Sequence, residues 1–196
     1  MDPGRILPIV VLGEGILLAL ALAWAWFTRA PLPAGDPATG LAWGVLAAAT
    51  LAAVNLTFLR ARGNRWPGDA LRHVCRAIVR PLFEHVNAAQ IALVSVLAGV
   101  AEELLFRGVV QPLVGLPAAS LIFGAVHVGG RGFIGYGVWA ACIGALFGWL
   151  MVETGGLLAP IVAHAVYDAF ALAYVRYGRD RVCDQELAAT VTRDQS

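Results

Sequence analysis

The 196-residue sequence contains no lysine and few charged residues of any kind. Charged residues make up 14% of the chain, hydrophobic residues make up 59%, and the mean hydropathy is +0.73. Because soluble domains are about one quarter charged, this composition excludes an ordinary soluble domain. The formal net charge of +1 gives no indication of nucleic-acid binding, and we predict no nucleic-acid partner.

Apolar runs of membrane length recur along the chain. They predict an all-α, polytopic membrane helix bundle with about six transmembrane helices. The runs are residues 6–27, 41–59, 88–110, 118–128, 133–152 and 157–175. The fourth run is short for a crossing on its own, and we expect Pro112 and Pro117 before it to break the helix. The chain is therefore predicted to be a multi-pass protein of the cell membrane, in contact with the lipid bilayer.

One connecting segment, residues 60–87, is basic. It holds six of the fourteen arginines, and its apolar residues recur at spacings of three and four. This pattern predicts an amphipathic helix in the membrane interface, and the positive-inside rule places it on the cytoplasmic side. Two spans separate it from the N-terminus, so we predict that the N-terminus and the C-terminus are both cytoplasmic.

These features predict a single membrane domain over residues 1–196. Residues 1–60 contain two N-terminal spans, residues 60–87 the basic segment, residues 88–176 the catalytic helices and residues 177–196 a tail. Within the first span, Glu14 needs a polar partner or a watery cavity, and its role at a site or in helix packing stays open. Gly144 and Gly148 form a small-xxx-small face that allows close helix approach.

Several common protease signals are missing. No His-Glu-x-x-His occurs, and the three cysteines lack the spacing of a metal site. No serine or cysteine has a base nearby in sequence. The ionisable residues inside the apolar runs are the remaining candidates, because such residues are costly in a membrane and are functional by default.

An acidic motif interrupts the third span. Glu103 and Arg107 are four residues apart, so they share one helical face in the order that favours an ion pair. Glu102 is rotated by about 100° from Glu103 and points elsewhere. We therefore expect Glu103 and Arg107 to make a charged helix tolerable, and Glu102 to be free for chemistry.

Two later spans each carry a pair of residues with the same spacing, Phe123 with His127 and His164 with Asp168. In a bundle these could converge with Glu102. A carboxylate shielded from solvent is a stronger general base, and a histidine can pass a proton to a leaving amine. Glu102 and His127 could thus activate water, while His164 donates to an oxyanion and Asp168 orients His164.

Two alternatives stay open from the residues alone. His127, His164 and Asp168 are plausible ligands for a zinc ion, with Glu102 as the base of a zinc-dependent membrane protease. Alternatively, the polar residues hold helices together in a non-catalytic immunity, scaffold or transport protein. Our leading prediction requires no cofactor or metal.

The motifs Glu102-Glu103-x-x-x-Arg107, Phe123-x-x-x-His127 and His164-x-x-x-Asp168 resemble those of the CPBP (CAAX protease and bacteriocin-processing, or Abi) family. This resemblance covers about residues 88–172. It implies a glutamate-dependent intramembrane endopeptidase in an all-helical membrane fold, acting on a protein or peptide substrate such as a C-terminal tail, a sorting signal or a leader peptide.

The resemblance also implies roles for individual residues. Glu102 and His127 resemble the pair that activates water, His164 and Asp168 resemble the pair at the oxyanion, and Glu103 and Arg107 resemble supports of the acidic helix. Many members have Asn where this chain has Asp168. An amide donates to an oxyanion whereas an ionised carboxylate does not, so Asp168 is predicted to orient His164.

Overall fold

The computed structural model describes residues 3–61 and 65–178, and all regular structure in these ranges is helical. The all-α prediction is thus confirmed, whereas residues 179–196 of the predicted tail lie outside the described residues. The helices are α1 (Pro3–Thr28), α2 (Pro37–Arg60), α3 (Gly68–Val74), η1 (Cys75–Val79), α4 (Arg80–Phe83), α5 (Ala88–Leu105), η2 (Phe106–Val110), α6 (Gln111–Val114), α7 (Leu116–Val126), η3 (Arg131–Phe133), α8 (Ile134–Thr154) and α9 (Leu158–Tyr177).

Five helical segments of the described chain are long and apolar enough to cross a membrane, rather than the six expected. They are residues 7–28, 37–60, 88–114, 131–154 and 158–177. The difference is α7, which has only 11 residues and at 1.5 Å per residue covers only about half of the hydrocarbon thickness. A polytopic helical bundle is confirmed, with α7 as a shorter apolar helix inside it.

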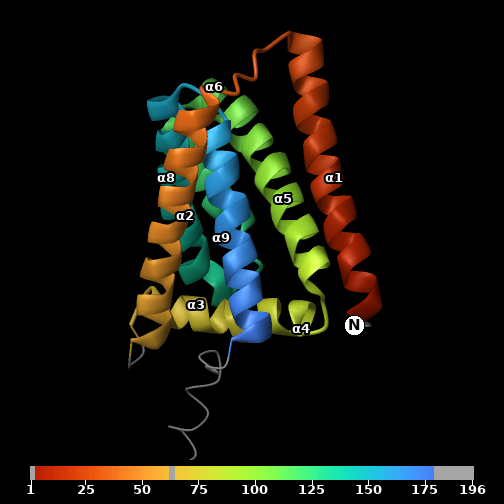
Figure 1. Cartoon of the computed structure of the whole chain (residues 1–196), viewed down its shortest axis with the longest axis vertical. Coiled ribbons are helices and arrows are strands. Elements are labelled where there is room, and N and C mark those ends of the chain that lie inside the picture. The colour runs from red at the N-terminus through yellow and green to blue at the C-terminus, as the bar shows by residue number, and fades with distance from the viewer. Residues whose placement is uncertain (1–2, 62–64, 179–196) are drawn as a thin grey trace, which may run out of the picture.

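Although α7 is short, it carries the chain back through the bundle. Its Gly124 lies against Gly137 near the start of α8, and Gly135 in turn lies against Ala70 of α3. The beginning of α1 and the end of α9 consequently lie at the same end of the molecule (Figure 1). This arrangement fits the predicted topology, in which both termini are on one side.

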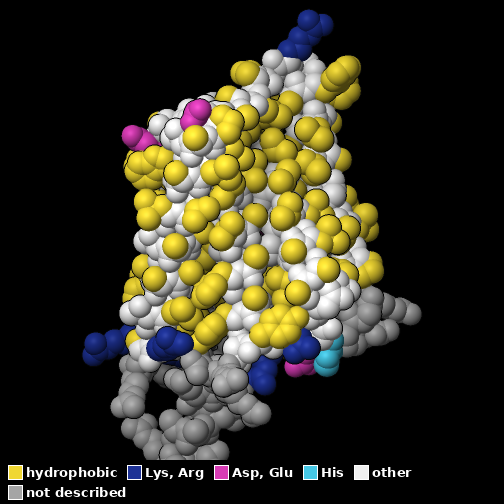
Figure 2. All heavy atoms as spheres, in the orientation of Figure 1, with side chains coloured by type: hydrophobic (Ala, Val, Ile, Leu, Met, Phe, Trp, Pro, Cys, Tyr) yellow, Lys and Arg dark blue, Asp and Glu magenta, His cyan; other side chains and the backbone are white. Residues whose placement is uncertain are grey.

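The basic segment runs across that same end of the bundle. Helices α3, η1 and α4 lie there roughly across the long helices (Figure 1). Arg side chains gather at this end, below a broad band of hydrophobic side chains (Figure 2). The segment contacts α2, α8 and α9, as an interfacial helix packed under the bundle would. That it faces the cytoplasm stays a prediction.

The expectation that Pro112 breaks the third span is wrong. The helix continues through Pro112 to Val114 and ends at Gly115, whose φ of 82° is left-handed. The π-helical turn η2 directly precedes Pro112, and in it the N–H of Gln111 bonds to the carbonyl of Phe106. Regular i to i−4 bonding has already been interrupted, so the missing N–H of proline removes little more.

Close contact between α5 and α9 sets up the candidate site. A Cβ atom at Gly99 would lie 2.9 Å from the backbone nitrogen of Ala165, so only glycine permits this approach. Gly99 is one turn before Glu103, and Ala165 follows His164. The two helices are therefore in close contact next to their ionisable residues.

Candidate active site

Arg107 and Glu103 form the buried centre of the site. Their side chains are 2% and 0% exposed, and Arg107 Nε lies 3.1 Å from Glu103 Oε2. The guanidinium carbon lies 4.5 Å from the centre of the Phe123 ring, with Phe106 and Phe147 further out. The ion pair predicted from the four-residue spacing is present, enclosed by aromatic rings.

The small-xxx-small face of α8 provides more than close packing. Arg107 donates from a terminal guanidinium nitrogen to the carbonyl of Gly144 at 2.9 Å, and Gln111 donates to the carbonyl of Gly148 at 3.1 Å. Without side chains at these glycines, the α8 backbone can accept hydrogen bonds from η2 and α6. The spacing Arg107–Gln111 matches the spacing Gly144–Gly148, so α8 and the acidic helix are joined in register.

Glu103 also reaches a second helix. Its Oε1 lies 2.8 Å from Nδ1 of His164 on α9, and both groups are buried. His164 Nε2 lies 3.5 Å from Asp168 Oδ2, a longer separation than a direct hydrogen bond. The sequence suggested Asp168 as the residue that orients His164, whereas the shorter contact is made by Glu103. We call Arg107, Glu103 and His164 the closed cluster.

His127 is held by the end of its own helix. The backbone N–H of His127 bonds to the carbonyl of Gly124 and not to that of Phe123. The Phe123 carbonyl therefore lacks its regular i+4 partner, and it lies 2.6 Å from the ring nitrogen Nδ1 of His127. Because that carbonyl can only accept, Nδ1 carries the proton. In neutral imidazole Nε2 is then the nitrogen with a free lone pair. The Phe-x-x-x-His spacing thus fixes the histidine tautomer.

That lone pair faces Glu102. His127 Nε2 lies 3.9 Å from Glu102 Oε2, and the two side chains are 25% and 14% exposed. This carboxylate oxygen has no hydrogen-bond partner among the described residues. As predicted from helical rotation, Glu102 and Glu103 point to different surroundings. We call Glu102 and His127 the open pair.

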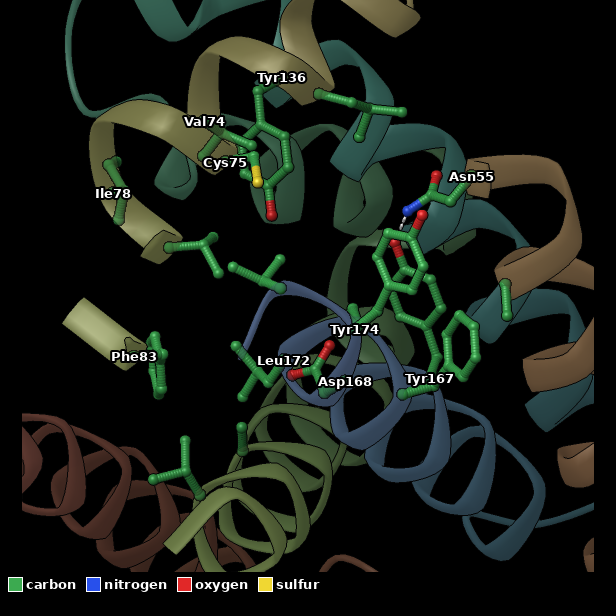
Figure 3. A pocket seen from close by; sticks show the side chains of 18 of the residues that line it. Asn55, Val74, Cys75, Ile78, Phe83, Tyr136, Tyr167, Asp168, Leu172 and Tyr174 are labelled. Atoms are coloured by element: carbon green, nitrogen blue, oxygen red, sulfur yellow. Dashed lines mark hydrogen bonds between the residues drawn. The ribbon is translucent and has the colours of Figure 1, made fainter. Parts of the chain in front are cut away.

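A cavity of about 410 Å³ lies next to the open pair. Asp168 and Leu172 of α9 border it on one side, and Ile78 and Phe83 of the basic segment border it on the other (Figure 3). Its polar lining includes Glu14, Asn55, Glu102, His127, Tyr136, Tyr167 and Asp168, and most of the rest is apolar. His164 is not among the lining residues, but its Nε2 lies 3.5 Å from Asp168, which lines the cavity.

Sequence reasoning missed one polar wall of this cavity. Asn55 of α2 donates to the hydroxyl of Tyr167 on α9 (Figure 3), and Tyr136 of α8 also lines the cavity. An isolated Asn or Tyr in an apolar run has no spacing signal, because its partner is on another helix. The exception is Glu14, which the sequence singled out as needing a polar partner or a watery cavity, and which does line this cavity.

The zinc alternative requires the side chains of His127, His164 and Asp168 to converge on one point. Within residues 3–61 and 65–178, no three His, Cys, Asp or Glu side chains form a group that could hold a metal ion. His127 and His164 also direct Nδ1 at a carbonyl and at Glu103. The arrangement therefore does not support the proposed zinc ligands, while the absence of a cofactor requirement stays a prediction.

The fold and the site define a class of protein, a multi-pass helical membrane protein with carboxylates and histidines beside an internal cavity. Residues 84–170 match the family model described as type II CAAX prenyl endopeptidase Rce1-like. The match covers less than half of the chain and is consistent with the resemblance of the three motifs to the CPBP family. The Rce1-like proteins are a family of membrane proteases.

One curated relative is the uncharacterized protein YpbD of Bacillus subtilis (strain 168). It is 34% identical over 100 residues, which cover 51% of this chain and 53% of the relative. The chain thus spans about half the length of the curated relative that it matches. No solved structure matches significantly.

Proposed function

We propose that the protein is a glutamate-dependent intramembrane endopeptidase that hydrolyses a peptide bond with water activated by Glu102 and His127. The observation that carries this proposal is the open pair. Two hydrogen-bond acceptors, Glu102 Oε2 and His127 Nε2, face each other at 3.9 Å at the edge of a cavity. A water molecule beside them can donate one O–H to each, and its oxygen lone pair then points away from both.

In the proposed reaction this water oxygen attacks the carbonyl carbon of the scissile bond. One water proton passes to Glu102, and the tetrahedral intermediate collapses when the proton reaches the leaving amine through the open pair. Atoms balance without any further reactant, because the products gain one hydroxyl and one hydrogen. The enclosed position of Glu102 supports this role, because a carboxylate shielded from water is a stronger base.

The oxyanion needs a donor, and His164 Nε2 is the candidate. With Nδ1 directed at Glu103, an imidazolium ring can still donate from Nε2. The long 3.5 Å separation from Asp168 leaves that N–H available. Since Asp168 lines the cavity and is the neighbour of His164 Nε2, we propose that the substrate carbonyl enters beside Asp168 and takes over this N–H.

The substrate class follows from the family and the position of the cavity. We propose a peptide segment at the membrane, such as a C-terminal tail, a sorting signal or a leader peptide. The apolar walls of the cavity suit the apolar residues of such a segment. We also propose the cytoplasmic side as the side of cleavage, on the basis of the arginine-rich end.

The test is Glu102→Gln, which keeps the shape of the side chain and removes the base. Peptides released from a membrane-peptide library by the purified protein in lipid discs are identified by mass spectrometry. The variant should lose about 100- to 10,000-fold in cleavage rate with an unchanged melting temperature. Retained cleavage would remove this mechanism.

The same assay separates the alternatives. Loss of cleavage after strong chelation, with recovery on adding zinc, would favour the metalloprotease. If no peptide of the library is cleaved and Glu102→Gln changes only stability, the non-catalytic alternative is favoured.

A further inference from the structure

Glu14 is an unexplained carboxylate on α1, outside the segment that matches the family. It follows Leu7 and Val10 at helical spacings of three and four, and those two residues pack against the cluster of Ile91, Val94 and Leu172. Glu14 therefore lies on the bundle-facing stripe of a helix whose other faces are apolar and exposed. A carboxylate within a span is costly unless it has a function or a partner.

The structure places this carboxylate at the cavity of the open pair. Glu14 lines that cavity together with Glu102, His127 and Asp168. Its Oε2 is buried and has no hydrogen-bond partner among the described residues. A buried acceptor without a donor is costly, so a ligand that supplies an N–H would be bound here.

The charges around the cavity indicate what kind of donor fits. Three carboxylates line it, from Glu14, Glu102 and Asp168, and none of the described residues that line it is Lys or Arg. Arg107 is buried, forms an ion pair with Glu103 and donates a hydrogen bond to the carbonyl of Gly144. Charge-assisted hydrogen bonds from a cation to a carboxylate are roughly twice as strong as neutral ones. The apolar walls can hold the hydrocarbon stem of such a cation.

We propose that Glu14 binds a basic side chain of the substrate, a lysine or arginine close to the scissile bond. This inference rests on the proposed function, since it takes the ligand of the cavity to be the peptide substrate. Sequences that flank membrane spans on the cytoplasmic side are rich in Lys and Arg, so such a residue would be present in many membrane-proximal peptides. Glu14 would thus be a specificity residue contributed by the N-terminal helix.

The experiment compares short apolar peptides that differ at one position only, which is Lys, norleucine or Glu. The varied position is moved along the peptide, and binding to the protein in lipid discs is measured by fluorescence anisotropy without turnover. The wild type should bind the best Lys peptide about tenfold more tightly than its norleucine counterpart. Glu14→Gln should bind the two within about twofold of each other.

Two further variants control the test. Asp36→Asn removes the same charge from an exposed loop position and should leave the preference for Lys unchanged. Glu14→Asp keeps the charge and should retain a preference, which serves the test if Glu14→Gln does not fold. A preference for Lys that survives in Glu14→Gln, or no preference in the wild type, would overturn the inference. An equal effect of Glu14→Gln on Lys and norleucine peptides would also overturn it.

Cleavage of the same peptides separates this inference from the proposed function. Charge-selective binding that depends on Glu14, without cleavage of any peptide, would support the binding site and remove the protease proposal. Cleavage without any charge preference would leave the protease proposal standing and remove only the role of Glu14.

Discussion

Glu102 and Glu103 are neighbours in sequence, yet they belong to two very different regions of the molecule. In the closed cluster, Glu103 bonds to Arg107 at 3.1 Å and to His164 at 2.8 Å, and its side chain is fully buried. In the open pair, Glu102 Oε2 has no hydrogen-bond partner among the described residues and faces the cavity. One residue's rotation around a helix thus separates a carboxylate held by an ion pair and a hydrogen bond from a carboxylate that faces the cavity. The closed cluster holds the acidic helix and His164 in place, whereas the open pair has a carboxylate oxygen that can contact a ligand in the cavity.

The largest effect is expected from breaking the closed cluster with Arg107→Leu. This change leaves the Glu103 carboxylate buried without its cation, which typically costs about 3–5 kcal/mol. Thermal unfolding in detergent should therefore show a strongly lowered melting temperature. The double variant Glu103→Gln/Arg107→Leu should recover part of the loss, because no unpaired charge remains. An Arg107→Leu protein as stable as the wild type would show that the cluster does not stabilise the fold.

This cluster also shows which contacts could be predicted from the sequence and which could not. The four-residue spacing predicted the Glu103–Arg107 pair and the divergence of Glu102, because both follow from helix geometry within one element. The contact between Glu103 and His164 was not predictable, since it depends on the approach of α5 to α9 at Gly99. Asn55 and Tyr167 were missed for the same reason. Helical periodicity describes faces of one helix and says nothing about which faces meet.

A sharper comparison uses the two carboxylates that face His164. Glu103→Gln replaces the carboxylate next to His164 Nδ1 by its amide, and Asp168→Asn does the same next to His164 Nε2. The contact at 2.8 Å is a charge-assisted hydrogen bond and the one at 3.5 Å is looser. Glu103→Gln should lower the cleavage rate by about tenfold to a hundredfold, and Asp168→Asn by less than about tenfold. The reverse order would make Asp168 the residue that orients His164, as the sequence alone suggested.

A smaller loss is expected when the contact between α8 and the closed cluster is crowded. In Gly144→Ala the new Cβ would lie 3.1 Å from a ring carbon of Phe123 and 3.3 Å from a guanidinium nitrogen of Arg107. Overpacking of this kind costs about 1–3 kcal/mol. Gly13→Ala on α1 is the matched control, because nothing lies within 4 Å of that position, and it should be neutral or slightly stabilising. Equal melting temperatures for the two variants would contradict this account.

The smallest effect concerns Asp36, which lies in the loop before α2 and is exposed, unlike the site carboxylates. Its Oδ2 accepts a hydrogen bond from the backbone N–H of Thr39 at 2.8 Å, which caps the helix and lowers the pKa of Asp36 below its usual 3.8. Because the folded pKa is the lower one, the stabilisation is fully present above pH 3.8 and is lost as the pH falls through the folded pKa.

Asp36→Asn separates this contribution from that of the other carboxylates. An asparagine caps about as well as an aspartate and does not titrate. The melting temperature of the wild type should therefore fall slightly more than that of Asp36→Asn as the medium is acidified below pH 3.8. If the melting temperatures of the two proteins fall in parallel with pH, the charge of Asp36 does not contribute measurably to stability. The size of a measured difference would give the contribution of an exposed capping carboxylate, with which the buried contacts of Glu103 can be compared.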